Sequence, residues 1–185
     1  MNTVITSREN ILETCKKIVS NKGLTAINMR LVAKECNIAL GSIYYYFPSK
    51  DELLIAIIES VWEDIFKWND FEKKELNFLE FVEKLFLHIR INVDKYPNFF
   101  MIHSISLSEN GKEKGYSKMT FYLANIKKKM KDILKKDTNI RPNVFNDKFS
   151  EEKFIDFLIM NIFSLLTQKK YDYMILIDLI KKSIY

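Results

Sequence analysis

The sequence predicts an all-α protein, and three observations lead to this prediction. Apolar residues recur at helical spacing along most of the 185-residue chain. Two Ser/Thr-x-x-Glu motifs, which are typical of helix N-termini, stand where such segments begin. Only four glycines and three prolines occur, so tight turns are scarce, and neither an all-β fold nor a glycine-rich nucleotide-binding loop is expected.

Four helices are expected in the first third of the chain, over residues 7–21, 29–36, 39–45 and about 50–68. Capping motifs begin the first helix at Thr6 and the fourth at Ser49. Asn28 is a good N-cap for the second helix. Gly23 ends the first helix in the left-handed conformation that a C′ residue adopts, and Asn37 is expected to take the same conformation in the turn after the second helix.

The rest of the chain is also predicted to be helical, over residues 76–96, 98–106, 119–136, 151–168 and 171–184. The polar stretch Ser108–Lys114, which contains Gly111 and is followed by Gly115, is expected to be a loop, and residues 137–147 are expected to be a connector. A domain boundary is predicted near residue 69. Residues 1–50 would form one domain, the helix over 50–68 would connect, and residues 69–185 would form the second domain.

Composition and charge narrow the class of protein. The net charge is +5, and residues 1–50 hold seven basic against three acidic residues, as expected for a small module that contacts phosphates. The lysine-rich run 127–131 contains no aromatic residue and is predicted to be a solvated helix face. No apolar run of 18 residues and no leader-like start appears, and the two cysteines, Cys15 and Cys36, are expected to be free thiols. We therefore expect a cytoplasmic protein without a membrane-spanning segment.

The second and third expected helices, with the short turn between them, form a helix-turn-helix pattern. In the third helix, Ile43 and Phe47 would face inward. Small residues on the outer face let a helix lie close to a DNA groove, and tyrosine hydroxyls can bond phosphates or bases. The outward set comprises Ala39, Leu40, Gly41, Ser42, Tyr44 and Tyr45.

This pattern resembles the N-terminal domain of the TetR family of bacterial repressors. The resemblance rests on Arg30, Val32-Ala33, Gly41-Ser42-Ile43-Tyr44, Tyr46-Phe47 and Lys50 with Leu53, and it covers roughly residues 7–60. It implies that Lys50 contacts a phosphate at the start of the fourth helix, and that Tyr44 and Tyr45 touch the DNA backbone or base edges. It also implies that Val32, Ile43 and Phe47 form the core of the module.

Three positions depart from the family pattern. Asn37 replaces the usual turn glycine, Ala39 replaces the usual serine N-cap, and Leu40 replaces a frequent lysine. We therefore expect few bidentate base contacts. Ala39 and Leu40 would contact thymine methyl groups, and Arg30 would be the one nearby residue able to form a bidentate hydrogen bond with a guanine.

The resemblance also implies that the C-terminal part is a helical domain that binds a ligand and forms a homodimer through the last two helices. Their apolar stripes suit a self-complementary interface, with plain intramolecular core as the alternative. The stripes comprise Ile155, Ile159, Ile162, Leu166, Leu176, Leu179 and Ile180.

A pocket for a small, mainly hydrophobic ligand is expected among the middle helices, where isolated polar groups lie among large apolar ones. A lone histidine or asparagine on an apolar face is more often a satisfied core residue, so that alternative stays open. The candidates are Trp62, Phe66, Leu85, His88, Asn92, Phe99, Phe100, His103, Phe121, Tyr122, Asn125, Phe154 and Asn161.

An enzyme is not expected, because no metal-ligand pair, nucleophile motif or phosphate-binding loop appears in the sequence. No cofactor and no metal is expected either. The function predicted is that of a transcriptional regulator, most often a repressor, which binds a palindromic DNA operator as a homodimer and is released by a small hydrophobic ligand. A dimeric DNA-binding adaptor that responds to a protein partner is the alternative.

Overall fold

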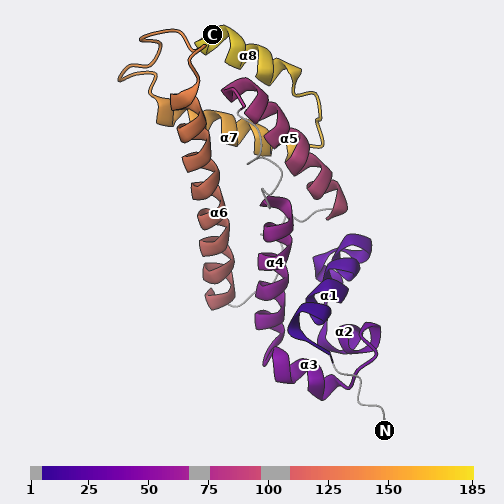
Figure 1. Ribbon diagram of the computed structural model, residues 1–185. Coiled ribbons are helices and arrows are strands. Elements are labelled where there is room, and N and C mark those ends of the chain that lie inside the picture. The colour runs from indigo at the N-terminus through magenta and orange to yellow at the C-terminus, as the bar shows by residue number, and fades with distance from the viewer. Residues whose placement is uncertain (1–5, 67–75, 97–108) are drawn as a thin grey trace. The chain divides into compact units, whose positions relative to one another are not determined.

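The computed structural model describes residues 6–66, 76–96 and 109–185 (Figure 1). All regular elements in these ranges are helices, which confirms the all-α prediction. The chain divides into two compact units. The first consists of Met1–Phe66 with Val93–Thr120, and the second of Lys67–Asn92 with Phe121–Tyr185. The expected domain limits at residues 50 and 69 stay a prediction.

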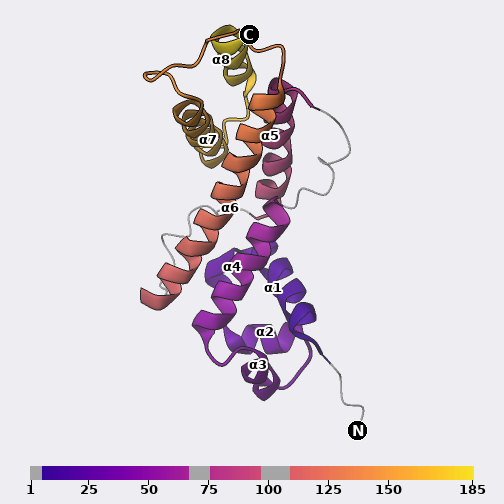
Figure 2. The same cartoon turned by 60° about the vertical axis from the view of Figure 1, so that its left-hand side comes forward.

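The part of the first unit up to residue 66 contains four α-helices and a short 3-10 helix. They are α1 (Arg8–Lys22), the 3-10 helix at Leu24–Ala26, α2 (Met29–Glu35), α3 (Leu40–Tyr46) and α4 (Lys50–Phe66). In both views of the chain, α1 lies beside α4 and α2 lies beside α3 (Figures 1 and 2). The order and approximate ends of these helices agree with the sequence prediction.

The ends of α1 differ in detail from the prediction. The N-cap is Ser7, not Thr6, because the Ser7 hydroxyl accepts a hydrogen bond from the backbone N–H of Asn10 at 3.1 Å. Gly23 has a positive φ of 77°, as expected, but its ψ of 165° lies outside the left-handed helical region. Such a backbone conformation is open to glycine and strained for other residues, so a glycine is required at this position.

The core of the first unit is built from one apolar face of each short helix and from almost the whole of α4. All six residues of the α4 segment 53–58 are buried, and so is the face of α1 that carries Ile11, Cys15 and Val19. A helix that is apolar nearly all round is stable only when neighbours cover it on more than one side. Each fully buried Ile or Leu side chain contributes roughly 1.5–3 kcal/mol.

The other four helices are α5 (Phe78–Lys95), α6 (Glu109–Lys136), α7 (Glu151–Thr167) and α8 (Met174–Ile184). The prediction of a loop over Ser108–Lys114 is wrong, because α6 begins at Glu109 and includes Gly111 and Gly115. Each glycine costs a helix about 1 kcal/mol relative to alanine, and a long, cooperative helix tolerates that cost. The last helix starts at Met174, three residues later than expected. The short helix expected over 98–106 lies outside the described residues.

The N-terminus of α5 has a hydrogen-bond partner for each of its first N–H groups. Asn77 and Glu80 bond reciprocally, with the Asn77 side chain accepting from Glu80 N at 2.9 Å and Glu80 Oε2 accepting from Asn77 N at 3.2 Å. The carboxylate of Asp137 accepts from Phe78 N at 2.8 Å, and the Tyr185 hydroxyl accepts from Leu79 N at 3.2 Å. The helix start is therefore stabilised both locally and by two residues far along the chain.

We expect Asp137→Ala to lower the free energy of unfolding by about 1–2 kcal/mol, because Phe78 N and the Tyr185 hydroxyl lose their acceptor. Burial raises the pKa of Asp137, but hydrogen bonds from Tyr185, Phe78 and Asn139 outweigh it and hold the pKa below its usual value. A carboxylate whose pKa is lowered by folding stabilises the folded state at pH values above its unfolded-state pKa. This contribution is lost as the pH falls through the folded-state pKa. Urea denaturation from pH 7 to pH 3 measures both effects.

The matched control for this substitution is Asp178→Ala, at an exposed position on α8. Equal effects of the two substitutions at pH 7 would contradict the capping role of Asp137. So would an Asp137→Ala penalty that stayed constant down to pH 3.

Candidate functional site

The turn between α2 and α3 has a geometry that its sequence explains. The Asn28 side chain caps α2 by accepting from Leu31 N at 2.9 Å, as expected. After α2, Asn37 adopts a φ of 53°, which confirms its expected left-handed conformation. Asn37 N donates to Lys34 O at 3.1 Å and Ile38 N donates to Ala33 O at 3.0 Å, the pair of bonds that defines a Schellman motif. The chain therefore turns within the four residues 36–39 and places α3 beside α2.

The helix α3 has a buried face and an exposed face, as the sequence predicts. Ile43 and Phe47 are fully buried, whereas Tyr45 is 82% exposed and Tyr44 is 47% exposed. Gly41 is also exposed, and Ser42 is half-buried. A Cβ atom built on Gly41 would have no neighbour within 4 Å, so the packing of the chain does not require a glycine here.

All the residues expected to contact DNA lie at the surface of α2, α3 and the start of α4. Arg30, Ala39 and Lys50 are exposed, and Leu40 is half-buried. Within the described residues, Arg30 and Lys50 have no carboxylate partner, unlike Lys22, whose ammonium lies 3.9 Å from Glu35. The surface around α3 therefore presents positive charge that no internal ion pair neutralises.

Two further residues support the exposed face of α3. The hydroxyl of Tyr46 donates to the carbonyl of Thr6 at 2.7 Å, so this tyrosine fastens α3 to the segment that precedes α1. The guanidinium of Arg8 lies 5.2 Å from the centre of the Phe47 ring, which is a cation–π distance. Sequence reasoning did not identify Arg8, because its contact with Phe47 joins residues 39 positions apart. An arginine in the first turn of an apolar helix was the one available signal.

The N-cap of α3 is Ala39, and no side chain accepts a hydrogen bond there. Its backbone angles, φ −65° and ψ 144°, are those of an ordinary N-cap residue. A serine at this position would therefore need no backbone adjustment to bond one of the free N–H groups of the helix.

The two cysteines are free thiols, as expected. Cys15 is buried in α1 and Cys36 is half-buried at the end of α2. Burial raises the pKa of the Cys15 thiol to about 12, and Cys36 adds to this shift. A thiol with so high a pKa stays protonated, which makes it a packing group in the helix-turn-helix rather than a nucleophile.

The residues expected to form a ligand pocket do not share one environment. Trp62 and Phe66 belong to the first unit, where both are buried and their rings stack 5.2 Å apart. In the second unit Leu85 is buried, His88 and Tyr122 are half-buried, and Phe121 and Asn125 are exposed. Phe99, Phe100 and His103 lie outside the described residues.

Three of the pocket candidates have partners inside their own unit. The Asn92 amide donates to His88 O at 2.9 Å, and the Asn161 amide donates to Phe157 O at 2.8 Å. Phe154 packs against three other phenylalanines, Phe78, Phe145 and Phe149. These contacts are those of satisfied core or helix-surface residues, the alternative that the sequence left open. The pocket itself stays a prediction.

The prediction that the apolar stripes lie at the dimer interface is wrong for six of their seven residues. Buried within the single chain are Ile155, Ile159, Ile162, Leu166, Leu176 and Ile180. Only Leu179 of that set is exposed, at 47%. Helical periodicity showed two apolar faces on these helices, and the sequence alone could not tell which face the chain itself covers.

Other apolar side chains on the last two helices are exposed instead. Phe157 and Met160 lie three residues apart on α7 and are 48% and 68% exposed. On α8, Met174 and Ile175 are 54% and 67% exposed. Together with Leu179, these four residues form what we call the α7–α8 apolar surface.

Within the described residues, no group of three or more His, Cys, Asp or Glu side chains is placed to hold a metal ion. None of the described helices is both long enough and apolar enough to span a membrane. The lysine-rich run contains an ion pair between Lys127 and Asp156, and Lys128 and Lys131 are exposed, as predicted for a solvated face.

Residues 11–57 match the family model described as "Bacterial regulatory proteins, tetR family". The chain is 38% identical over 56 residues to the uncharacterized HTH-type transcriptional regulator YuxN of Bacillus subtilis, covering 30% of this chain and 19% of YuxN. It is 40% identical over 58 residues to the HTH-type transcriptional repressor KstR of Mycolicibacterium smegmatis, covering 31% of this chain and 28% of KstR. The matched segment thus spans less than a third of these relatives.

Solved structures share the fold over nearly the whole chain. A TetR transcriptional regulator from Legionella pneumophila aligns with a TM-score of 0.67 at 21% identity, covering 100% of both chains. The TetR-family regulator PfmR from Thermus thermophilus aligns with a TM-score of 0.61 at 18% identity, covering 94% of this chain and 96% of PfmR. The N-terminal segment therefore matches the TetR family of transcriptional regulators, and the chain shares the fold of solved structures from that family. Its relatives are regulators and not enzymes, in agreement with the sequence prediction.

We expect Ala39→Ser to raise the free energy of unfolding by about 1 kcal/mol, because the serine hydroxyl would accept from a free N–H group at the start of α3. Urea denaturation followed by circular dichroism measures the change. The matched control is Ala124→Ser, at an exposed position inside α6, where a serine caps nothing and no gain is expected. A gain at position 124 equal to that at position 39 would contradict the missing cap.

Proposed function

We propose that the chain is a DNA-binding transcriptional repressor that binds a palindromic operator as a homodimer and is released by a small, mainly hydrophobic ligand. The observation that carries the DNA-binding part is the exposed face of α3. The opposite side is anchored in the core by the fully buried Ile43 and Phe47, while Tyr44 and Tyr45 extend into solvent. The major groove of B-DNA is about 12 Å wide and accommodates one α-helix, so a rigidly held helix with this face suits it.

The glycine in α3 supports the same proposal. A glycine inside a helix costs roughly 0.5–1 kcal/mol relative to alanine. Nothing inside the chain requires that cost at Gly41, because an added Cβ would meet open space. A surface that must approach a groove closely gains from the missing side chain. Gly41 thus favours close docking of α3 over mere packing of a three-helix core.

The residues around α3 would divide the contacts among them. Tyr44 and Tyr45 would bond phosphates or base edges through their hydroxyls, and Ser42 would do the same at shorter reach. Ala39 and Leu40 would contact thymine methyl groups, while Arg30 is the one residue of the set able to grip a guanine bidentately. Few bidentate contacts imply that phosphates supply most of the affinity.

Lys50 would contact a phosphate at the start of α4. It is the first residue of that helix, whose Glu52 N–H already bonds the Ser49 hydroxyl at 3.1 Å. Its exposed ammonium and the remaining N–H groups of the first turn together favour an anion.

We expect Lys50→Met to weaken DNA binding and to reduce the slope of log K against log salt by about 1.8, because the dimer loses one phosphate contact, worth about 0.9, in each protomer. Fluorescence anisotropy on a duplex selected by the wild-type chain, between 50 and 300 mM salt, measures the slope. The matched control is Lys17→Met, at an exposed position on α1, which should leave the slope unchanged. A slope that Lys50→Met leaves at the wild-type value would show that this ammonium contacts no phosphate.

The homodimer would form through the α7–α8 apolar surface. It presents five large apolar side chains on two helices of one unit, each about half or more exposed. Exposed large apolar side chains favour association, and a surface that pairs with a second copy of itself forms a twofold dimer. Two recognition helices related by that twofold axis would read two half-sites about 34–36 Å apart, which requires a palindromic operator.

We expect the double substitution Met160→Glu with Ile175→Glu to convert the dimer to monomer, because each carboxylate would be buried opposite its own copy. Sedimentation velocity measures the mass. The matched control is Ile91→Glu on α5, whose side chain is 64% exposed outside this surface, and it should leave the dimer intact. A double variant that stays dimeric would place the interface elsewhere.

The ligand part of the proposal rests on the aromatic content of the chain, with 14 phenylalanines and nine tyrosines, and on the fold. A protein of the same fold, described as the multidrug binding protein EbrR complexed with imidazole, aligns with a TM-score of 0.63 at 18% identity over 98% of this chain and 96% of EbrR. A thermal-shift screen with lipophilic compounds, followed by operator release for each hit, tests this part. A dimer that binds DNA and responds to no compound would favour an adaptor controlled by a protein partner.

A further inference from the structure

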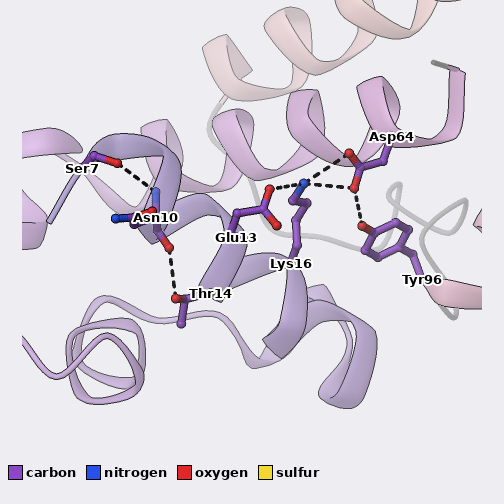
Figure 3. Close-up of polar contacts among 7 residues, drawn as sticks. All are labelled: Ser7, Asn10, Glu13, Thr14, Lys16, Asp64 and Tyr96. Carbon is purple, nitrogen blue, oxygen red and sulfur yellow. Dashed lines mark hydrogen bonds and ion pairs between the residues drawn. The ribbon is translucent and has the colours of Figure 1, made fainter. Parts of the chain in front are cut away.

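One polar cluster in the first unit joins α1, α4 and the residue that follows α5, three segments that are far apart in the sequence (Figure 3). The ammonium of Lys16, in the middle of α1, lies 3.2 Å from Oδ1 and 3.0 Å from Oδ2 of Asp64, near the end of α4. The hydroxyl of Tyr96, the residue directly after α5, donates to the same Oδ2 at 2.6 Å. Glu13 forms a second ion pair with Lys16 from one turn earlier on α1.

The cluster is shielded from water at its centre. The Lys16 side chain is only 11% exposed and that of Asp64 is 31% exposed, while Tyr96 is buried. Hydrogen bonds and charges in such a place are stronger than on an open surface, and an ion that loses its partner there is costly. Burial and the bond to Asp64 raise the pKa of Tyr96, so its hydroxyl stays protonated and donates a hydrogen bond at neutral pH.

Asp64 is the shared acceptor of this cluster. Its Oδ2 atom accepts from both Lys16 and Tyr96, so the two donors fix the carboxylate from opposite chain segments. If the Tyr96 hydroxyl moves away, the carboxylate loses one of the two groups that orient it, and the bond to Lys16 loosens as well. The position of Tyr96, at the end of α5, is thereby linked to the position of Lys16 on α1.

Both helices that meet at Asp64 also form the frame of the helix-turn-helix. α1 contributes Ile11, Cys15 and Val19 to the core that holds α2 and α3. α4 carries the exposed Lys50 at its first residue, fourteen residues before Asp64, which is about 21 Å along the helix axis. A small displacement at the Asp64 end therefore shifts the opposite end of a rigid, buried helix.

We propose that Lys16, Asp64 and Tyr96 form a positioning clasp that holds the helix-turn-helix in its DNA-binding arrangement, and through which movement at the end of α5 changes the affinity for DNA. None of the three residues touches DNA in this proposal. It rests on the proposed function, and it adds the point at which a signal from α5 reaches α1 and α4.

The test uses the full chain with Tyr96→Phe, which keeps the buried ring and removes only the hydroxyl. The probe is a palindromic duplex that the wild-type chain selects from a random-sequence pool. We expect the dissociation constant to rise at least about fivefold, the lower end of ordinary allosteric coupling. Without DNA, amide hydrogen exchange along α1 and the end of α4 should become faster.

The matched control is Tyr173→Phe. The Tyr173 hydroxyl donates to Glu83 Oε1 at 2.9 Å, which is the same chemistry in the second unit. It should leave both DNA affinity and exchange in α1 unchanged. A second variant, Lys16→Met, and the double variant with Tyr96→Phe complete a cycle. Because both donors act through one carboxylate oxygen, the combined loss of affinity should be smaller than the product of the single losses.

Each outcome decides the proposal. Equal behaviour of Tyr96→Phe and Tyr173→Phe overturns it. A lower melting temperature of Tyr96→Phe with unchanged DNA affinity shows a purely structural role and also overturns it. Independent, multiplicative losses from Lys16→Met and Tyr96→Phe overturn the shared-acceptor step. A wild-type chain that selects no DNA overturns the proposed function itself, which is distinct from the failure of the clasp.

Discussion

The burial of Ile43 and Phe47 is the constraint on which the rest of the site depends. The helix α3, which contains Ile43 and is followed directly by Phe47, has seven residues and no side-chain N-cap, and so short a helix is not stable alone in water. Its stability must come from the core that α1, α2 and α4 provide. Once these two side chains are fixed in that core, the direction of the remaining residues of α3 is fixed as well, and Tyr44 and Tyr45 extend outward.

The same dependence explains how the first unit can be both rigid and responsive. Apolar packing holds α4 along most of its length, because ten of its 17 residues, from Leu53 to Phe66, are buried. Directional polar contacts lie at its two ends, with the Ser49 cap at one and Asp64 at the other. Packing resists deformation of the helix, whereas hydrogen bonds at its ends can be exchanged for others. A regulator needs both properties in one element.

The prediction of individual helices from the sequence was successful where caps and periodicity agreed. Asn28 and Asn37 act as expected because capping and the left-handed turn depend on neighbours within four residues. The predicted start of α6 was wrong because Gly111 and Gly115 are weak helix formers and favoured a loop. Their local preference does not decide the state of a helix of 28 residues. The capping pair Asn77 and Glu80 was present in the sequence but was not recognised.

The sequence by itself determined the helical class, the helix-turn-helix and the outward face of α3, because each depends on spacing within one or two helices. The tertiary structure decided which faces of α7 and α8 are covered, and it placed Ile155 inside and Met160 outside. It also brought Lys16, Asp64 and Tyr96 together across separations of 48 and 32 residues. Periodicity identifies an apolar or polar face, but only packing between distant segments determines which partner that face meets.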